Sequence, residues 1–214
     1  MIKPWGLYLI SDEPMLADGS FLRLLEHALG HGLRIVQMRA KSLPIDTLLS
    51  VGAQIRRMTS DHHAAFIVND DPDLALRLQA DGVHIGQSDA SPEVARHLLG
   101  PDRLIGFSAH SRRDILRAHL KPVDYVSLGP IFATRTKTDA EQPVGVELLK
   151  WANRTCTLPL VAIGGITLDN LDDVLQAETR NVAVISAISR SADPPAAARE
   201  FIRRISPRLS AQPA

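Results

Sequence analysis

The stretch AAFIVNDDPDLALRLQADGVHIGQ, residues 64–87, holds two short apolar runs separated by one amphipathic segment. Its first and last runs are β-rich and almost continuously apolar, as strands are when both faces of their sheet are covered. The segment between them, residues 71–80, opens with Asp and Pro, which favour a helix N-terminus. The stretch therefore predicts strand, helix and strand, the unit from which parallel sheets are built.

The same alternation runs from one end of the chain to the other. Strands are expected at residues 5–11, 34–41, 64–70, 82–87, 103–110, 125–132, 159–166 and 182–188. Helices are expected at residues 20–32, 44–58, 71–80, 91–100, 111–120, 144–154, 167–178 and 194–205. Eight such units in 214 residues predict an α/β fold, a closed (β/α)8 barrel of the TIM type, with an open doubly wound sheet as the alternative. We expect one domain over residues 1–214, with a tail that frays from about residue 206.

The composition is that of an ordinary globular protein. Lys plus Arg and Asp plus Glu each total 24, so the overall charge gives no sign of a nucleic-acid partner. A hydrophobic share of 45% supports a substantial core, and no apolar run approaches the roughly 20 residues needed to cross a bilayer. Cys156 is the only cysteine, which excludes an internal disulfide and fits a reducing compartment. We therefore expect a cytoplasmic protein without membrane or nucleic-acid partners.

Three polar side chains alternate with apolar ones in the expected strand RIVQMRAK, residues 34–41. Gln37, Arg39 and Lys41 share one face of this strand, while its apolar residues share the other. In a barrel the apolar face packs under helices, so the polar face points toward the barrel mouth. Buried cations are costly without a counter-charge, so they predict a bound anion or nearby carboxylates. A solvated strand end with ordinary surface cations is the other interpretation.

Carboxylates follow the next two expected strands. Asn69 and Asp70 end one strand, and Asp89 follows the other. Adjacent strands lie about 4.8 Å apart, so carboxylates at neighbouring strand ends can converge on one ion. A carboxylate pair without His or Cys suits Mg²⁺, which shares itself with waters and substrate phosphates. Alternatively, Asp70 and Asp89 cap the helices that follow them, and the residues alone leave both interpretations open.

A second anion site is expected near the seventh and eighth units. Gly164 and Gly165 permit close backbone approach at a strand end, and the TLDN that follows at 167–170 is expected to begin a helix. Barrels often bind phosphate in the loops after strands seven and eight. The loop ATRTKTDAEQP, residues 133–143, lies between the two expected sites. We expect its ATRTK part to belong to the active site and TDAEQP to form a mobile cover, with no role assigned to Arg135.

The end of the fifth expected strand, GFSAHS, carries Ser108 and His110. A nucleophilic serine needs a base and a third orienting group, and no such triad is legible in the sequence. Ser108 is therefore interpreted as a hydrogen-bond donor to a ligand. His110 is open between a structural residue, a substrate contact and an acid or base. His84 is interpreted as an interior histidine with satisfied ring nitrogens, and the pair His62 and His63 as surface.

Six ordered motifs resemble the thiamine phosphate synthase family, and the resemblance covers residues 5 to about 203. The motifs are VQMRAK, IVNDDPDLALRLQADGVHIGQSD, GFSAHS, DYVSLGPIFATRTK, VAIGGIT and VAVISAI. The resemblance implies a transferase that joins a hydroxymethylpyrimidine diphosphate to a hydroxyethylthiazole phosphate, or its carboxylated form. It implies that pyrophosphate leaves with the help of Mg²⁺ and that thiamine phosphate is formed. The partners would be small phosphorylated substrates, and a homo-oligomer is compatible with the sequence.

The resemblance also implies roles for particular residues. Asp70 and Asp89 would bind Mg²⁺. The pyrimidine diphosphate would be bound by Gln37, Arg39, Lys41, Asn69, Ser108 and Lys137. The residues expected to act in catalysis are Lys137, Arg39 and Ser108. The thiazole phosphate would be surrounded by Thr134, Thr136, Gly165, Ile185 and Ser186.

Two rival functions remain at this level. A paralogue that tautomerises a thiazole phosphate would use the histidine at His110, but such relatives tend to lose the metal aspartates and basic residues that this chain keeps. A non-catalytic barrel would bind a phosphorylated metabolite without turnover. The chain also departs from the family pattern at Ser127, at Ala40 and in QAETRN, residues 176–181, where a glycine-bearing turn is usual. These departures bear on loop geometry more than on chemistry.

Overall fold

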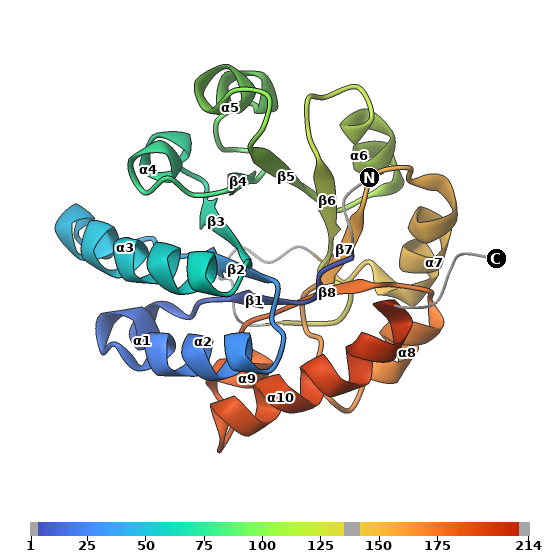
Figure 1. Cartoon of the computed structure of the whole chain (residues 1–214). Helices are drawn as coiled ribbons and strands as arrows, with labels where there is room; N and C mark the ends of the chain where they lie inside the picture. The colour runs from blue at the N-terminus through green and yellow to red at the C-terminus, as the bar shows by residue number, and fades with distance from the viewer. Residues whose placement is uncertain (1–3, 135–141, 210–214) are drawn as a thin grey trace.

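Eight parallel strands form a closed barrel in the computed structural model of the chain, which describes residues 4–134 and 142–209. The strands follow one another in sequence order, and the last pairs with the first (Figure 1). They are β1 (Gly6–Ile10), β2 (Ile35–Met38), β3 (Ala65–Asn69), β4 (Gly82–Ile85), β5 (Leu104–Ala109), β6 (Tyr125–Leu128), β7 (Leu160–Ile163) and β8 (Asn181–Val184). The predicted (β/α)8 barrel is confirmed, and the open sheet is excluded.

Helices surround the barrel and cover the outer faces of its strands (Figure 1). They are α1 (Glu13–Ala17), α2 (Ser20–Gly30), α3 (Ile45–Asp61), α4 (Pro72–Arg77), α5 (Pro92–Leu99), α6 (Arg112–Ala118), α7 (Gly145–Thr155), α8 (Leu171–Gln176), α9 (Ser186–Ser189) and α10 (Pro194–Ile205). In the described residues, none of these helices is long and apolar enough to cross a bilayer.

The helix and strand boundaries correct the sequence analysis at three places. The short helices α1 and α9 were not expected, and α9 begins at Ser186, inside the strand predicted at 182–188. The segment 167–170 is a turn, because α8 begins only at Leu171. After α10, Ser206–Leu209 form a 3-10 helix that contacts β1, and the expected fraying of the tail stays a prediction. Residues 210–214 lie outside the described part of the chain.

The core has two layers because side chains alternate across each strand. The larger layer lies between strands and helices and contains Val36, Met38, Phe66 and Val68. The smaller layer fills the barrel interior and contains Trp5, Tyr8, Ile10, Ile35, Ile67, Tyr125, Val161 and Ala183. Each large side chain that is fully buried contributes about 1.5–3 kcal/mol to stability. Ile10 and Ala183 of this interior layer also line the pocket described below.

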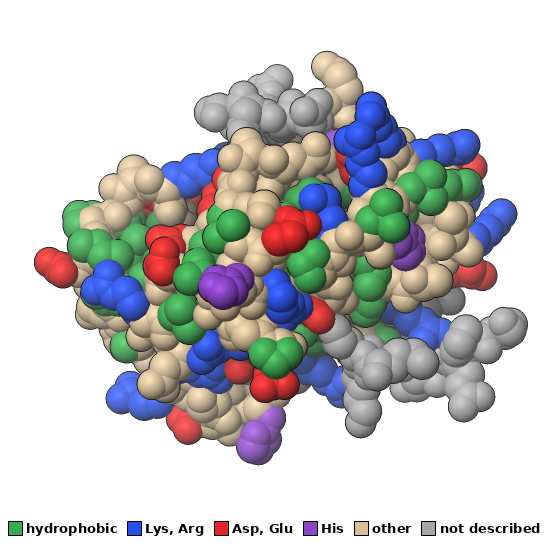
Figure 2. Space-filling view, turned by 90° about the horizontal axis from the view of Figure 1, so that it is seen from above, with side chains coloured by type: hydrophobic (Ala, Val, Ile, Leu, Met, Phe, Trp, Pro, Cys, Tyr) green, Lys and Arg blue, Asp and Glu red, His purple; other side chains and the backbone are tan. Residues whose placement is uncertain are grey.

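Acidic and basic side chains are interspersed over the outer face shown in Figure 2. This distribution agrees with a formal net charge of zero for the whole chain. A concentration of charge that could bind an anion is therefore expected at the strand ends rather than on this face.

Candidate active site

A pocket of about 350 Å³ opens at the carboxyl ends of the strands. It lies where (β/α)8 barrels place their active sites. Every predicted site residue in the described part of the chain lines this one pocket. These residues are Gln37, Arg39, Lys41, Asn69, Asp70, Asp89, Ser108, Thr134, Gly165, Ile185 and Ser186. Thr136 and Lys137, with the rest of 135–141, lie outside the described residues.

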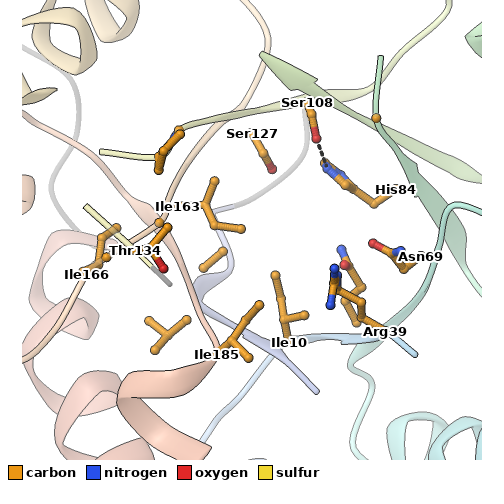
Figure 3. A pocket seen from close by; sticks show the side chains of 18 of the residues that line it. Ile10, Arg39, Asn69, His84, Ser108, Ser127, Thr134, Ile163, Ile166 and Ile185 are labelled. Atoms are coloured by element: carbon orange, nitrogen blue, oxygen red, sulfur yellow. Dashed lines mark hydrogen bonds between the residues drawn. The ribbon is translucent and has the colours of Figure 1, made fainter. Parts of the chain in front are cut away.

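The pocket has a polar side and an apolar side. Figure 3 shows Arg39 and Asn69 together on one side, across the opening from Thr134 and Ile166. The isoleucines Ile10, Ile163 and Ile185 lie between and beside these groups. Such a pocket can bind an anionic group at one side and an apolar ring at the other.

Gln37 lies on β2, but Arg39 and Lys41 follow the end of that strand. The expected strand was therefore too long, although all three side chains reach the pocket as predicted. The reason is that the backbone of Arg39 leaves the β2–β3 ladder. Its N–H donates to Ser11 Oγ at 2.8 Å, and its carbonyl oxygen accepts from the same hydroxyl at 3.1 Å.

The two carboxylates expected to bind metal face each other. Burial raises the pKa of Asp70 to about 6, and a hydrogen bond with Asp89 and the negative charge of Asp89 add to this rise. Lys41 and Arg39 oppose the rise through their positive charges. Asp70 also has a φ of 64°, in the left-handed region that is costly for a side chain larger than glycine. The fold thus holds two like charges together beside two cations.

The helix-cap interpretation of these carboxylates is wrong. Asp71 caps α4 by accepting from the Leu74 N–H at 2.9 Å. Ser91 caps α5, and its hydroxyl accepts from the backbone N–H of Val94 at 3.3 Å. Asp70 and Asp89 are therefore free of the capping role that the sequence left open.

Asp89 is instead held by the strand end of β4. Its carboxylate accepts from the Gly86 N–H at 2.7 Å. A Cβ atom at Gly86 would lie 2.8 Å from the same carboxylate oxygen, so a larger residue there would push the Asp89 carboxylate away from this N–H. The carboxylate pair suits a hard cation, because a positive charge between the two groups stabilises the negative charge on their oxygens. No group of three His, Cys, Asp or Glu side chains forms a metal site in residues 4–134 and 142–209, so the remaining ligands would be phosphate oxygens and water.

Residues 11–13, which follow β1, hold the loops on both sides of the pocket. The sequence analysis did not predict this role. Glu13 accepts from the N–H groups of Lys41 and Ser42, both at 2.9 Å. The hydrogen bonds from Ser42 and Lys41 lower the pKa of Glu13. Together with the contacts of Ser11 to Arg39, they fix the backbone that carries the two cations.

The middle residue of this segment reaches the opposite side. Asp12 accepts from the Ser189 hydroxyl at 2.8 Å and lies 3.7 Å from the Arg190 guanidinium. Ser189 ends α9, whose first residue is Ser186. Residues 11–13 thus connect the basic loop after β2 to the helix after β8. A Ser-Asp-Glu sequence after a strand gives no periodic signal, and only the closed barrel brings its partners near.

The glycine pair after β7 makes room for the chain after β6. A Cβ atom at Gly164 would lie 2.5 Å from Pro130, and one at Gly165 would lie 2.6 Å from the carbonyl oxygens of Phe132 and Ala133. Both glycines also have positive φ, of 96° and 67°. The Phe132 N–H donates to the Gly164 carbonyl at 3.0 Å. The pair therefore seats the segment that leads to Thr134.

The turn after the glycine pair is organised by Asn170 rather than by a helix start. Its amide oxygen accepts from the Thr167 N–H at 2.8 Å, and its amide nitrogen donates to the Gly165 carbonyl at 2.9 Å. The expectation that 167–170 presents helical N–H groups to an anion is therefore wrong. Any phosphate bound here would depend on the glycine backbone and on Ser186.

His110 lines the pocket and is held from both sides. Its Nδ1 lies 2.6 Å from the Gly129 carbonyl oxygen, which can only accept, so Nδ1 carries a proton. Its backbone N–H donates to Asp114 at 3.0 Å. His62 and His63 are exposed, as predicted.

A chain of buried hydrogen bonds runs beneath the pocket floor. Gln37 Nε2 donates to the Tyr8 hydroxyl at 2.9 Å, and the hydroxyls of Tyr8 and Tyr125 are 2.9 Å apart. The Tyr125 hydroxyl lies 3.2 Å from His84 Nδ1. His84 Nε2 lies 3.0 Å from Ser108 Oγ, the bond drawn in Figure 3. The prediction that both ring nitrogens of His84 are satisfied is confirmed, but His84 also lines the pocket.

A closed parallel barrel with cations, paired carboxylates and a glycine-lined loop at one end defines a class of enzymes that act on small phosphorylated molecules. A family model described as thiamine monophosphate synthase matches residues 7–188. The chain therefore belongs to the thiamine monophosphate synthase family.

Similar proteins agree with this family over nearly the whole chain. A thiamine-phosphate synthase of Moorella thermoacetica is 42% identical over 197 residues, which is 92% of this chain and 94% of that protein. One of Methanospirillum hungatei is 40% identical and covers 92% of this chain and 95% of its own. A solved structure of thiamine phosphate pyrophosphorylase from Pyrococcus furiosus superposes with a TM-score of 0.85 at 33% identity, covering 97% of this chain and 98% of its own.

Proposed function

We propose that this chain is a thiamine phosphate synthase. It joins 4-amino-5-hydroxymethyl-2-methylpyrimidine diphosphate to 4-methyl-5-(2-hydroxyethyl)thiazole phosphate, or to its carboxylated form, and releases pyrophosphate. The observation that carries the proposal is the two-sided pocket. Cations and paired carboxylates gather at one side of it, and Gly165 and Ser186 lie at the other.

The diphosphate belongs at the polar side. Arg39, Lys41 and Asn69 line this side, and Lys137 is proposed to join them from the loop after β6. Guanidinium and ammonium groups there offset the negative charge that builds on the leaving pyrophosphate. Arg39 and Lys137 act in catalysis in this sense, because their contacts strengthen as the leaving group departs. Removing one such electrostatic donor typically costs roughly 2.7–4 kcal/mol of transition-state stabilisation.

Mg²⁺ would bind between Asp70 and Asp89, and the hydrogen bond between them and the raised pKa of Asp70 support this position. The ion would supply positive charge to the diphosphate oxygens. The part of the protein itself is to hold both carboxylates, through the left-handed backbone at Asp70 and the Gly86 N–H at Asp89.

The pyrimidine ring belongs at the pocket floor, where Gln37 and Ser108 can bind its polar atoms. The bond between the methylene carbon and the diphosphate oxygen breaks, and both electrons leave with pyrophosphate. The aminopyrimidine stabilises the positive charge on that carbon until the thiazole nitrogen donates its lone pair to it. No side-chain nucleophile is needed in this reaction. Excluding water protects the carbon from hydrolysis.

The thiazole phosphate belongs at the other side. Ile185 and the neighbouring isoleucines offer apolar surface to the thiazole ring. The groups proposed to surround the phosphate are Thr134, Thr136, Gly165 and Ser186. This places the thiazole nitrogen toward the pyrimidine and the phosphate toward the loops after β6, β7 and β8.

The proposal is tested by mixing the purified protein with both substrates and Mg²⁺, then measuring pyrophosphate and thiamine phosphate. Both products should form only when all three are present. Binding of both substrates without release of pyrophosphate would favour the non-catalytic barrel. Conversion of the thiazole phosphate alone into an isomer would favour the tautomerase that uses His110. A cytoplasmic location and a homo-oligomer remain predictions.

A further inference from the structure

The buried hydrogen-bond chain starts and ends at residues that line the pocket. Gln37 and Ser108 are its two ends, and His84 also lines the pocket. Tyr8 and Tyr125 form its middle and are fully buried, with 0% of their surface exposed. Gln37 and Ser108 are the two residues proposed to bind the pyrimidine ring, so the inference rests on the proposed function. The chain physically connects them across the inside of the barrel.

Each hydroxyl in the hydrogen-bond chain has one proton to donate, and buried donors are normally paired, so pairing every proton fixes the direction of the bonds once one is known. The Gln37 amide nitrogen can only donate, so the Tyr8 oxygen accepts and the Tyr8 proton goes to Tyr125. The Tyr125 proton then goes to His84 Nδ1, which must be the unprotonated ring nitrogen. His84 Nε2 therefore carries the proton of the neutral ring and donates to Ser108 Oγ.

Consequently the two ends of the chain present opposite chemistry to a ligand. The Ser108 oxygen already accepts from His84, so its own proton is available for a ligand atom that accepts. The Gln37 amide nitrogen is used by Tyr8, so its carbonyl oxygen is available for a ligand atom that donates. In a 4-aminopyrimidine the amino group donates and the ring nitrogens accept. The 4-oxo analogue reverses this pattern at the substituted carbon and the nitrogen beside it.

We propose that Tyr8, Tyr125 and His84 are positioning residues that set the direction of this hydrogen-bond chain, so that Ser108 donates and Gln37 accepts, and that this order selects an aminopyrimidine over an oxopyrimidine. None of the three needs to touch the reacting atoms. Their effect passes through the protonated nitrogen of His84 and the orientation of the Gln37 amide.

The surrounding barrel is shaped to hold the chain in place. A Cβ atom at Gly106 would lie 2.3 Å from the Tyr125 hydroxyl oxygen and 2.4 Å from His84 Nδ1. Only glycine at this β5 position leaves room for the bond between those two groups. The His84 and Tyr125 rings also stack at 5.5 Å between centroids, and Trp5 packs edge-on against Tyr125 at 5.2 Å.

The tyrosines remain protonated at neutral pH, as the direction of the chain requires. Burial raises the pKa of the Tyr8 hydroxyl above its ordinary value, although its hydrogen bonds with Tyr125 and Gln37 oppose this rise. Burial and the neighbouring Tyr8 raise the pKa of Tyr125 well above its ordinary value. Each tyrosine hydroxyl therefore keeps the one proton that it donates to the next group in the hydrogen-bond chain.

The first test is nuclear magnetic resonance of histidine labelled with ¹⁵N, in the free protein at neutral pH. The protein has 8 histidines, so the His84 signals are assigned by their loss in His84→Gln. The wild-type protein should show His84 protonated at Nε2 alone. Tyr125→Phe removes the donor to Nδ1 and should give a mixture of the two neutral forms. A wild-type His84 protonated at Nδ1, or an unchanged spectrum in Tyr125→Phe, would overturn the proposal.

The second test measures binding of the hydroxymethylpyrimidine without its diphosphate, in its 4-amino and 4-oxo forms. The wild type should prefer the amino form, and Tyr125→Phe should lower the ratio of the two affinities roughly tenfold. Affinity for the thiazole phosphate should not change. Thr59→Val is the matched control, because it removes another fully buried hydroxyl, which donates to the Ile55 carbonyl within α3. It should leave the ratio unchanged.

Failure of this inference can be told from failure of the proposed function. If the wild type releases pyrophosphate but Tyr125→Phe keeps both the spectrum and the affinity ratio, the function stands and the inference falls. If the wild type shows no turnover, the resonance measurement still decides the direction of the chain in the free protein. Gly106→Ala provides a second route, since its added methyl should disrupt the same bond while both tyrosines remain, and it should give the same mixed His84 spectrum.

Discussion

Asp70 lines the pocket in a conformation and an environment that lower the stability of the folded protein. Its backbone is left-handed, and its carboxyl group is partly buried against another carboxyl group. Strained backbone conformations of this kind cluster at active sites and ligand-binding sites. A cation between Asp70 and Asp89 would offset the electrostatic part of the cost, because it favours the ionised form that burial disfavours.

Asp70→Asn should therefore stabilise the metal-free protein in a pH-dependent manner. The folded-state pKa of Asp70 is raised from 3.8 to about 6, so the folded protein keeps a proton that the unfolded chain releases. Wild-type stability falls as pH rises through this window, whereas asparagine does not titrate. After allowance for solvent screening, the free energy of unfolding of the variant should exceed that of wild type by about 1 kcal/mol at pH 7.5.

This difference is measured by urea denaturation in the presence of a chelator. It should shrink as the pH falls and approach zero below about pH 3, where Asp70 is protonated in both states. Asp169→Asn, which changes an exposed carboxylate in the turn before α8, should show no such trend. An Asp70→Asn effect of equal size at both pH values would contradict the assigned pKa.

Glu13 illustrates a residue that acts through a loop rather than on the substrate. Glu13→Ala removes the acceptor of the Lys41 and Ser42 N–H groups and should loosen the loop that carries Arg39. We expect KM for the pyrimidine diphosphate to rise roughly tenfold, as for loss of one or two charge-assisted hydrogen bonds. KM for the thiazole phosphate should stay within error in steady-state assays. Glu147→Ala, which breaks only a surface pair with Lys150, is the control. Equal rises in both KM values would show a general loss of structure.

At the scale of elements, the strand–helix units with clear periodicity were predictable and the short helices were not. Gln37 was placed correctly because alternation along β2 needs no tertiary information, whereas Arg39 and Lys41 reach the pocket from the loop after the strand. The helix α9 has four residues, too few for a periodic pattern, and its first residues continue an apolar run. The turn at 167–170 has a sequence that is typical of a helix start. Its backbone is not helical, because the Asn170 side chain binds the Thr167 N–H and the Gly165 carbonyl oxygen.

The Tyr8–Tyr125 pair and the Ser11–Glu13 segment could not be predicted for a different reason. Their partners are far apart in sequence, and contact depends on closure and on the register of neighbouring strands. Tyr8 is opposite Ile35, two residues before Gln37, and Tyr125 is opposite Gly106. Once this register is known, both contacts follow from the alternation of side chains.

The turn between α8 and β8 carries a testable departure from the family pattern. Glu178 has a φ of 64° just after the C-terminal end of α8, where glycine is the usual residue. It is exposed, so its side chain gives little in return. Glu178→Gly should therefore raise the free energy of unfolding by about 1 kcal/mol without changing turnover. Gln176→Gly, inside the helix, should instead lower it by about as much. A less stable Glu178→Gly protein would show that the side chain makes a contact worth more than the strain.

The whole molecule brings the two proposed anion sites to one end of a barrel, and its formal net charge is zero. The strands β2, β3 and β4 lead to the cations and carboxylates, and β7 and β8 lead to the glycine pair and Ser186. Because the barrel is closed, these groups face each other across one pocket. Two phosphorylated substrates can thus be held by opposite walls with their reacting atoms between them.

Asp89→Ala tests this division of the pocket. Loss of one carboxylate should reduce turnover at least a hundredfold, as for other electrostatic groups aimed at a leaving group. Binding of the thiazole phosphate, measured by calorimetry, should change less than twofold, because its site lies at the opposite wall. Proportionate loss of both would refute the separation of the two sites.

The most direct test of the account is a single-turnover experiment with enzyme in excess over the pyrimidine diphosphate, in the presence of thiazole phosphate and Mg²⁺. Rapid quenching follows pyrophosphate and thiamine phosphate together. The account predicts that both products reach equal amounts and that neither forms in a chelator. Tight binding of both substrates with no pyrophosphate released would contradict it.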